Sequence, residues 1–397
     1  MDMKMKNIYG FIAVSAIAIA SMLSCDKQDD TYRQYIVPGG YNYPAKASSV
    51  TATSGYQRVD VSWATPLDPA VKSVKIYWDS NRDSMSVNYA DAVDGVVTAH
   101  IENLEERSYT FNIVNFDGHG NKSLASEVTV SPYGDGWLST HAERKVYSAV
   151  MKGDDALLSL GTPVDEMVYT RFRYKNKDGE IVVSDPIPMD STDVYLSDAM
   201  KGKYFEYQSA YCPKNGLDVV WNSNWIKTST PIYYNLADKS WTLSLTANQQ
   251  RNADYGPEKM FDGDLETRYY SSTNTSLRKN FPKIIAINTN AAEGMEPTVT
   301  GINVIQHLTE SKSRLVKTLN FYVGDNEYNP NDADYLNSFG APVLDASFRQ
   351  DMVEQAKDFA PVTGSCFAIA FKSSYSTYGY IDVLEFEVIG YVQANAD

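Results

Sequence analysis

The chain has 397 residues, enough for two to four domains that each bury a core of their own. Its formal net charge is −15, it contains 29 tyrosines, and it gathers no cluster of lysine or arginine beyond the first residues. This composition excludes a disordered chain and argues against binding to nucleic acid or to an anionic membrane surface, both of which need clustered positive charge.

The N-terminus carries a targeting signal. Lys4 and Lys6 precede an apolar run over residues 8–23, which is shorter than a membrane span. The run ends in Leu23-Ser24-Cys25, which resembles a bacterial lipobox. The resemblance implies that residues 1–24 are a signal peptide and that Cys25 is lipidated, so that two acyl chains anchor the protein.

The residues after Cys25 suggest where the anchored protein goes. Asp26-Lys27-Gln28-Asp29-Asp30 resembles the surface-export signal of Bacteroidota lipoproteins. The resemblance implies a cell-surface protein on the outer membrane, with its lipid anchor as the sole membrane contact. Residues 25–44 are polar and lack periodicity, which predicts a flexible tether.

Residues 45–132 show the alternation of short β-strands. Apolar and polar residues alternate over 48–53, 58–63, 73–78, 96–101, 109–114 and 126–130. The stretch ending in Trp63 resembles the second strand of a fibronectin type III domain, and the stretch from Leu104 to Phe111 resembles its tyrosine corner. We therefore expect a fibronectin type III-like sandwich with Trp63 and Tyr109 in its core.

Residues 133–236 predict a second immunoglobulin-like or fibronectin-like sandwich. Alternating runs recur over 144–151, 156–160, 167–173, 181–184, 193–196, 205–211 and 226–230. Trp221 and Trp225 stand four residues apart near a predicted strand end. They could form a wall on which a sugar stacks, although packing in a core or between domains is the favoured interpretation.

Residues 237–397 contain an acidic turn between two runs of strand-like sequence. Asp262-Gly263-Asp264 bends at its glycine, and Thr267 follows three residues later. Oxygen donors in a short bent loop suit calcium, which takes six to eight oxygen ligands in flexible geometry. By itself the turn is equally compatible with an acidic surface loop.

The surrounding sequence resembles a discoidin domain of the coagulation factor 5/8 C-terminal type, a galactose-binding-like β-sandwich. The resemblance starts at Lys259-Met-Phe-Asp-Gly-Asp-Leu-Glu-Thr-Arg and continues through strand-like runs at 282–288, 299–307, 318–324, 367–372 and 381–390. Tyr269 and Tyr270 stand where the family often has tryptophan. The resemblance implies a structural calcium ion held by the carbonyl of Lys259 and by the side chains of Asp262, Asp264, Thr267 and Glu385.

The three cysteines do not predict a disulfide bond. Cys25 belongs to the lipobox, and Cys212 and Cys366 fall in different predicted domains. We expect Cys212 and Cys366 to be buried as small apolar residues.

Motifs for catalysis are missing from the sequence. It has four histidines and none in a metal-binding spacing, no G-x-S-x-G, no Walker sequence and no G-x-G-x-x-G. The acidic run over residues 325–334 lacks the glycine and closing glutamate of an EF-hand. We therefore expect a binding protein and not an enzyme.

Three predicted loops carry side chains that suit a sugar. Tyr269 and Tyr270 follow the acidic turn, residues 307–314 link two strands, and residues 373–380 precede the last strand. Aromatic rings accept the C–H faces of sugars, and charged groups bind their hydroxyls. We expect a ligand site built from His307, Arg314, Tyr375 and Tyr378, although each tyrosine alone could be an ordinary strand-end aromatic.

Together these features predict an all-β chain of tandem β-sandwiches, two fibronectin- or immunoglobulin-like and one discoidin-like jelly roll. The resemblances imply a non-catalytic lipoprotein that binds an oligosaccharide or polysaccharide through its C-terminal sandwich. They also imply a place in a polysaccharide-utilisation system, beside a SusC/SusD-type transporter. A surface adhesin that contacts a host protein is the alternative, and an accessory arm of a glycoside hydrolase is a third.

Overall fold

The computed structural model describes residues 43–246, 249–306, 312–329, 332 and 334–394. The predicted signal peptide, Cys25 and nearly all of the predicted tether therefore lie outside the described residues. The chain divides into two compact units, one of residues up to Leu138 with Asn215–Asp218, and one of the remaining residues up to Asp397. The predicted boundaries at 132 and 236 remain predictions.

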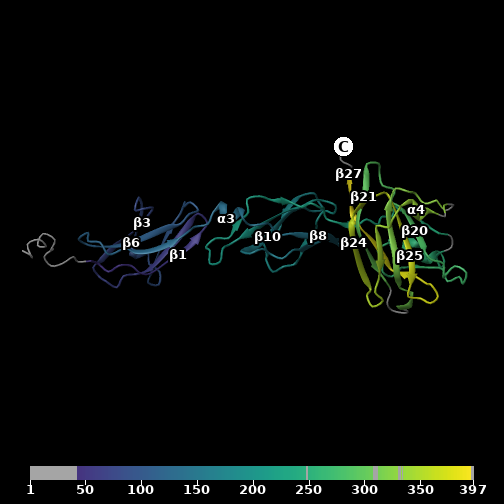
Figure 1. The fold of residues 1–397 in the computed structure, drawn as a ribbon, viewed down its shortest axis with the longest axis horizontal. Helices are drawn as coiled ribbons and strands as arrows, with labels where there is room; N and C mark the ends of the chain where they lie inside the picture. Colours follow the sequence, from purple (N-terminus) through teal and green to yellow (C-terminus); the bar gives the residue numbers. More distant parts are fainter. Residues whose placement is uncertain (1–42, 247–248, 307–311, 330–331, 333, 395–397) are drawn as a thin grey trace, which may run out of the picture. The chain divides into compact units, whose positions relative to one another are not determined.

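The first unit is a sandwich of two antiparallel sheets (Figure 1), with strand orders β1-β2-β5 and β4-β3-β6-β7. Six of its seven strands lie where alternation predicts them, and β4 is the additional one. Its elements are β1 (Ser48–Gly55), β2 (Arg58–Ala64), β3 (Val71–Trp78), β4 (Asp83–Val87), the 3-10 helix η1 (Tyr89–Asp91), β5 (Val96–Ile101), β6 (Tyr109–Asp117), β7 (Ser126–Val130) and the short helix α3 (Asp135–Ser139).

Alternate residues of these strands form the core. In β5 every second residue is buried, as the two-residue period of a strand requires. Trp63 and Tyr109 are buried in this core, which confirms their predicted place. The backbone N–H of Glu105 donates to the hydroxyl of Tyr109, 3.1 Å away, so the predicted tyrosine corner is present.

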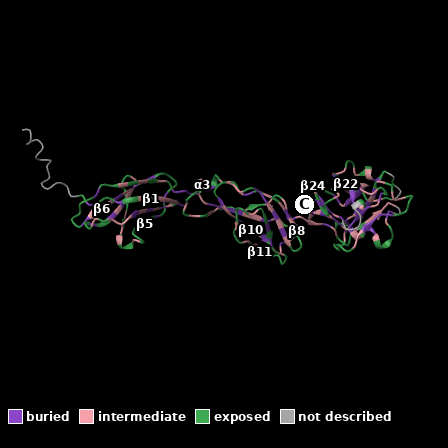
Figure 2. Cartoon of the chain, turned by 90° about the horizontal axis from the view of Figure 1, so that it is seen from below, coloured by how far each residue is buried: buried purple, intermediate pink, exposed green. Residues whose placement is uncertain are grey.

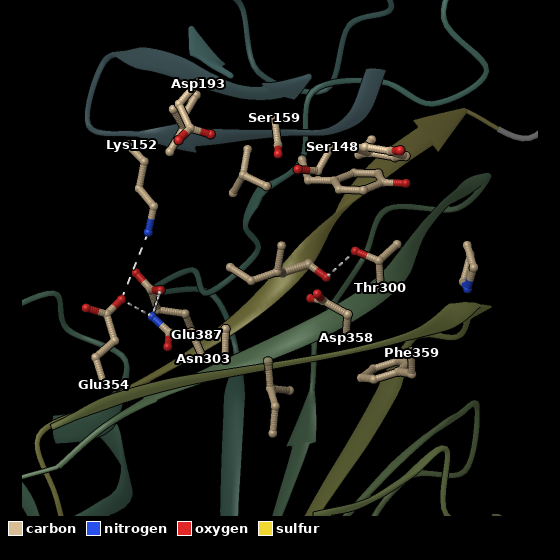
Figure 3. Close-up of a pocket in the computed structure, with 18 residues that line it drawn as sticks. Ser148, Lys152, Ser159, Asp193, Thr300, Asn303, Glu354, Asp358, Phe359 and Glu387 are labelled. Atoms are coloured by element: carbon tan, nitrogen blue, oxygen red, sulfur yellow. Dashed lines mark hydrogen bonds and ion pairs between the residues drawn. The ribbon is translucent and has the colours of Figure 1, made fainter. Parts of the chain in front are cut away.

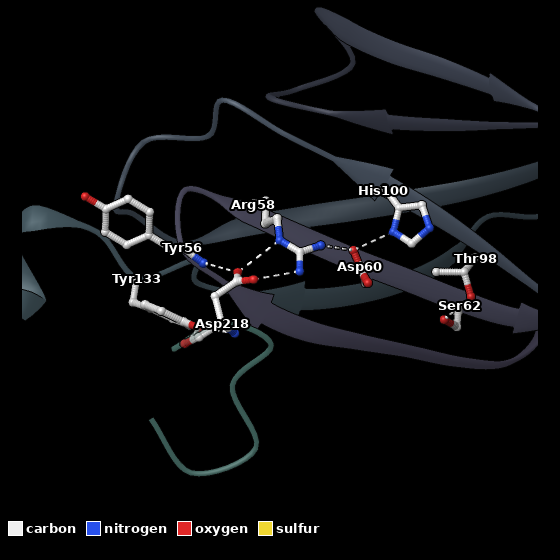
Figure 4. A network of polar contacts seen from close by, with 8 residues as sticks. All are labelled: Tyr56, Arg58, Asp60, Ser62, Thr98, His100, Tyr133 and Asp218. Carbon is white, nitrogen blue, oxygen red and sulfur yellow. Dashed lines mark hydrogen bonds and ion pairs between the residues drawn. The ribbon is translucent and has the colours of Figure 1, made fainter. Parts of the chain in front are cut away.

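A distant segment of the chain completes the first unit. Both oxygens of Asp218 accept hydrogen bonds from the guanidinium of Arg58, at 2.8 and 2.9 Å, and one of them also accepts from the backbone N–H of Tyr56. Arg58 also contacts Asp60, which binds the ring of His100 (Figure 4). These partners hold the pKa of the Asp218 carboxyl below its usual range, because the bond from Arg58 favours the ionised form.

The second unit begins with a sandwich over residues 146–227. Its two sheets have strand orders β13-β9-β8 and β11-β10-β14-β15, with β12 also paired to β10 and β16 to β14. The strands are β8 (Val146–Lys152), β9 (Asp155–Leu160), β10 (Met167–Lys175), β11 (Ile181–Val183), β12 (Ile187–Pro188), β13 (Asp193–Leu196), β14 (Glu206–Tyr211), β15 (Val220–Trp221) and β16 (Ile226–Lys227).

The C-terminal sandwich has two main sheets, β17-β27-β21-β24 and β18-β20-β25-β22-β23, and a small pair, β19-β26. Its elements are β17 (Tyr234–Asn235), β18 (Thr242–Leu245), η2 (Ala253–Tyr255), η3 (Pro257–Met260), β19 (Tyr269–Tyr270), β20 (Lys283–Asn288), β21 (Met295–Ile305), η4 (Lys312–Arg314), β22 (Val316–Gly324), α4 (Tyr335–Ser338), β23 (Leu344–Ser347), β24 (Glu354–Thr363), β25 (Cys366–Ser374), β26 (Asp382–Val383) and β27 (Glu385–Ala394).

Each sandwich encloses its own buried residues (Figure 2). The all-β fold class is therefore confirmed. Cys366 is buried as predicted, whereas Cys212 is only half-buried. Within the described residues, no helix has the length and apolarity that a membrane crossing demands.

Candidate functional site

The short pair β19-β26 brings together three segments of the C-terminal sandwich. Tyr270 of β19 lies opposite Asp382 of β26. The backbone N–H of Arg251 donates to the carbonyl of Tyr270, 2.9 Å away, so the segment around Arg251 runs beside β19. This arrangement places Arg251, Tyr270 and the end of the 373–380 loop at one edge of the sandwich.

Two arginines contact the ring of Tyr270. The guanidinium carbons of Arg251 and of Arg314 each lie 5.3 Å from the centre of that ring. Tyr270 is buried, and burial raises the pKa of its hydroxyl. A cation over an aromatic face is attracted by the negative face of the ring, which fixes both guanidinium groups in place.

A second group of contacts continues from Tyr270. The ring of Tyr380 lies 6.0 Å from that of Tyr270 and 5.8 Å from that of Tyr378. The guanidinium of Arg278 lies 5.0 Å from the centre of the Tyr378 ring, and its Nη1 donates to the hydroxyl of Tyr380 at 3.2 Å. We call the six residues Arg251, Arg278, Arg314, Tyr270, Tyr378 and Tyr380 the arginine–tyrosine cluster.

The loop that carries Arg278 is fixed from two sides. Gly379 has a φ of +77°, and a Cβ added there would lie 2.3 Å from the carbonyl oxygen of Arg278. The buried ammonium of Lys283 donates to the carbonyls of Leu277, Arg278 and Asn280, at 3.1 to 3.5 Å. Burial lowers the pKa of the Lys283 ammonium to about 8.

The predicted ligand residues are partly brought together. Arg314 and Tyr378 belong to the arginine–tyrosine cluster, and Tyr378 is 55% exposed. Tyr375 is half-buried, and its hydroxyl donates to the carbonyl of Phe348 at 2.7 Å. His307 lies outside the described residues.

Sequence reasoning missed Arg251 and Arg278 and gave no role to Tyr380. Arg251 precedes the acidic turn, and Arg278 precedes β20, so neither lies in one of the three loops that the sequence predicts to bind the ligand. One signal in the sequence could have pointed to them: residues 251–278 of this acidic chain contain three arginines, Arg251, Arg268 and Arg278. Their convergence depends on tertiary contacts that no local pattern encodes.

The predicted calcium loop forms as a compact turn. Gly263 has a φ of +74°, which suits glycine, and the hydroxyl of Thr267 donates to both carboxylate oxygens of Asp262, at 2.8 and 3.0 Å. The backbone N–H of Gly263 donates to Oε2 of Glu385, 3.3 Å away, so the last strand meets this loop. The ammonium of Lys259 lies 3.6 Å from Asp262.

Glu385 shows how well these residues suit a cation. Its side chain is buried, and its Oε1 has no hydrogen-bond partner in the described part of the chain. Burial raises its pKa to about 7, and the charges of Asp262, Glu387 and Asp264 act in the same direction. A buried carboxylate with an unpartnered oxygen beside two further carboxylates fits a hard cation. Within the described residues, however, no three His, Cys, Asp or Glu side chains are already arranged as a metal site.

Trp221 and Trp225 stack with arginines on the sheet of β10 and β14. The guanidinium of Arg171 lies 4.1 Å from the centre of the Trp221 ring, and that of Arg173 lies 4.6 Å from the Trp225 ring. Arg171 donates twice to the amide oxygen of Gln208, and Arg173 pairs with Glu206 at 2.6 Å. We call Arg171, Arg173, Trp221 and Trp225 the arginine–tryptophan ladder.

A cavity of about 420 Å³ lies in the second unit between strands β8 and β9 and the sheet of β21, β24 and β27. Its size falls within the range of small-ligand pockets. Asn303 donates to Glu354 and to Glu387, both at 2.7 Å, and Lys152 lies 4.0 Å from Glu354 (Figure 3). Asp193 and Asp358 also line it, so its lining is net negative and its polar groups already pair with one another.

Comparisons with known proteins find weak similarities. A family model described as a domain of unknown function (DUF4998) matches residues 25–219, just under half of the chain. No curated protein matches the sequence.

Three solved structures illustrate the structural similarities. The C-terminal domain of a chitobiase from Bacteroides fragilis is 14% identical, with 40% of this chain and 99% of that chain covered and a TM-score of 0.32. A SusE-like protein is 7% identical, with 87% of this chain and 97% of that one covered and a TM-score of 0.32. A CBM32 module from Clostridium perfringens, solved with GalNAc-β-1,3-galactose, is 11% identical, with 39% and 98% covered and a TM-score of 0.30. These values are too low to transfer a ligand or a function to this chain.

Proposed function

We propose that the C-terminal sandwich binds a glycan at the arginine–tyrosine cluster and does so without catalysis. The observation that carries this proposal is the position of Tyr378. Its ring is more than half exposed and lies beside Tyr380 and the guanidinium of Arg278. An exposed ring next to fixed hydrogen-bond donors is the combination that a sugar needs.

The chemistry of the cluster follows from its two kinds of side chain. Tyrosine rings accept the apolar C–H face of a sugar, and guanidinium N–H groups donate to its hydroxyl oxygens. Such a shallow site buries little area, and water competes for each hydroxyl. We therefore expect a monovalent Kd of about 10⁻³ to 10⁻⁵ M. Many copies on one polymer would add avidity.

The test is a glycan-library screen with the full chain, followed by titration of Tyr378→Ala and Arg314→Ala. Both variants should lose binding while their thermal unfolding stays close to that of the wild type. Tyr195→Ala is the matched control, because Tyr195 is 60% exposed on β13, which lies outside the C-terminal sandwich. Wild-type binding by both site variants would place the ligand elsewhere.

A competition experiment with free sugar distinguishes glycan binding from the alternative function as an adhesin. Binding to a glycan surface should be displaced by the free sugar, whereas an adhesin would bind a protein surface and ignore the sugar. Binding of a host protein that survives deglycosylation and excess sugar would favour the adhesin.

A calcium ion is proposed under the Asp262–Thr267 loop. Asp262, Asp264, Thr267, Glu385 and the carbonyl of Lys259 would hold it, and it would link the first loop of the sandwich to its last strand. An ion that binds only the folded state adds about 2.7 kcal/mol to stability at a hundredfold excess over its Kd. Chelation should therefore lower the Tm; an unchanged Tm and no bound metal in elemental analysis would reject the ion.

The lipobox resemblance supports the proposal that the protein is an outer-membrane lipoprotein exposed at the cell surface. A surface position would let it serve a polysaccharide-utilisation system beside a SusC/SusD-type transporter. Cys25→Ser should release the protein from membranes, and protease added to intact cells should digest the wild type. Full protection from protease would exclude a surface role.

A further inference from the structure

The arginine–tyrosine cluster gathers positive charge in a chain whose net charge is −15. Most arginines in the described part of the chain are neutralised by a carboxylate: Arg58, Arg82, Arg107, Arg173, Arg268 and Arg349. Arg251, Arg278 and Arg314 contact aromatic rings instead, and no ion pair joins any of the three to a described carboxylate. These three arginines therefore share one edge of one sandwich. Arg144 and Arg171 also have no carboxylate partner among the described residues, but they donate to backbone carbonyls and to the amide oxygen of Gln208.

The acidic groups near the cluster do not cancel this charge. Asp382 is buried and lies 3.6 Å from Arg268, a fourth arginine at the margin of the cluster. Asp254 is exposed on η2, where its carboxylate accepts from the side chain of Asn252 at 3.3 Å. Among the described residues, the four arginines of this edge, Arg268 included, stand against two carboxylates, Asp382 and Asp254, so cations outnumber anions there.

Stacking on tyrosine leaves the donors of an arginine usable. A guanidinium has five N–H donors in one plane and accepts no hydrogen bond. When its face lies on an aromatic ring, the donors at its edge can still bind an oxyanion with two parallel bonds. Within the described residues, Nη1 of Arg278 donates to Tyr380, and Nε of Arg278 is buried without an acceptor. No hydrogen bond to a described residue engages the side chains of Arg251 and Arg314. These two arginines therefore keep the donors that match carboxylate and sulfate groups, and Nη2 of Arg278 adds to them.

We propose that the ligand of this site is an anionic glycan, whose carboxylate or sulfate groups bind Arg251, Arg278 and Arg314. This proposal rests on the proposed function and adds the charge of the ligand to it. A neutral sugar would satisfy a few guanidinium donors through hydroxyls and leave the positive charges without a partner. An acidic sugar supplies both the hydroxyls and the counter-charge.

The expected signature is selectivity that weakens with salt. Hydrogen bonds to charged groups contribute more than those between neutral groups, so we expect at least roughly tenfold tighter binding of an acidic oligosaccharide than of its neutral form. Surface ion pairs are screened when the Debye length falls from about 10 Å at 0.1 M salt to about 3 Å at 1 M. The preference should therefore shrink as sodium chloride is added.

The experiment uses the full chain and two matched pairs of probes. Oligogalacturonate is compared with its methyl ester, and a sulfated galactan oligosaccharide with its desulfated form, by isothermal titration at 0.05 M and 0.5 M sodium chloride. A preference confined to the first pair assigns the ligand to uronates, and one confined to the second assigns it to sulfated sugars. Either preference supports the proposal.

Arginine variants connect the preference to the site. Arg278→Gln and Arg314→Gln should remove the preference for the acidic probe but keep residual binding of the neutral form, since glutamine still donates hydrogen bonds. Arg171→Gln is the matched control, because Arg171 also lies over an aromatic ring but in the other sandwich of the unit. Melting curves for all three variants identify any loss that arises from unfolding.

Two outcomes overturn the proposal, and they differ from failure of the proposed function. Equal affinity for acidic and neutral probes, lost in Tyr378→Ala, would reject the anionic ligand and keep the glycan site. A preference for acidic probes that survives both glutamine variants would show that residues outside the cluster recognise the anionic group. If neither pair nor any glycan of the library binds, the proposed function itself fails.

Discussion

The second unit uses arginine with aromatic rings twice, in the arginine–tryptophan ladder and in the arginine–tyrosine cluster. In the ladder each guanidinium has an acceptor within the protein: Arg171 binds Gln208 and Arg173 binds Glu206. In the cluster, Arg314 and Arg251 meet the ring of Tyr270 without a carboxylate or amide acceptor among the described residues. Both groups place arginine on aromatic rings, but only in the ladder do both guanidinium groups have an acceptor.

This difference separates a structural motif from a candidate site. A cation stacked on a ring contributes about 0.5 to 2 kcal/mol, whether it stabilises a sheet or holds a side chain ready for a ligand. What distinguishes the two is the set of donors that remain without an acceptor. In the ladder, Trp221 and Trp225 are half-buried and each holds an arginine of its own sheet. Their packing role in a core or between domains stays a prediction.

Gly379→Ala should disrupt the arginine–tyrosine cluster by displacing the backbone of its loop. The added Cβ would meet the carbonyl of Arg278 at 2.3 Å, at a φ of +77°, so the loop must move. We expect loss of glycan binding and about 3 kcal/mol of lost stability from combined strain and overpacking, measured by titration and denaturant unfolding. Gly340→Ala is the control: its φ is +76°, but nothing lies within 4 Å of the new Cβ, so it should cost only about 1 kcal/mol and leave binding intact. Equal losses in both variants would show that strain alone is measured.

The stability of the protein, measured against pH in the presence of chelator, should show a dependence that arises in the C-terminal sandwich and not in the sandwich of the arginine–tryptophan ladder. Burial raises the pKa of Glu385 from its ordinary value of 4.5 to about 7, so between these values the folded state binds more protons than the unfolded state. Stability should therefore fall as pH rises from about 4.5 through 7, by at most on the order of 3 kcal/mol. Added calcium should oppose this fall, since the ion needs the ionised carboxylate.

Two variants test whether this pH dependence arises from Glu385. Glu385→Gln should flatten the fall in Tm between pH 5 and pH 8. Glu206→Gln, which removes the carboxylate of the ladder, should keep it. A wild-type Tm in chelator that is constant or rises across this range would show that Glu385 ionises freely in the folded protein.

The smallest expected effects compare one aromatic ring from each region. Trp221→Ala removes the ring under Arg171 and should cost about 2 kcal/mol without changing glycan binding. Tyr378→Ala removes an exposed ring, so we expect a change within about 0.5 kcal/mol and loss of binding. Paired unfolding and binding measurements check both. Loss of binding in Trp221→Ala with little loss of stability would move the site to the ladder.

The strands were predictable because each depends on a local pattern. In β5 the alternation of valine and alanine with polar residues fixes which side chains face the core, and Trp63 on β2 fills that core. The loop glycine Gly263 was predictable for the same reason, since its turn needs a positive φ. These features are decided within a few residues of sequence.

The candidate site is predictable only in part. The sequence predicts Arg314 and Tyr378 as ligand residues because they fall on loops between strands of the discoidin-like pattern. Arg251 and Arg278 reach the same edge through contacts with Tyr270, Tyr378 and Tyr380. Such contacts join segments tens of residues apart, and neither alternation nor turn chemistry reports them.

Lys283 gives the Arg278 loop a cation that is part of the chain itself and loses its charge only by deprotonation, at a pKa of about 8. Its ammonium lies among the carbonyl oxygens of Leu277, Arg278 and Asn280 and the amide oxygen of Gln249, the kind of oxygen shell that a bound monovalent ion would have. Because this cation is covalently attached, neither dialysis nor a competing ion can exchange it. The proposed calcium loop of the same sandwich would hold an exchangeable ion. Demetallated protein should thus keep the Arg278 loop in shape while the Asp262–Thr267 loop loosens.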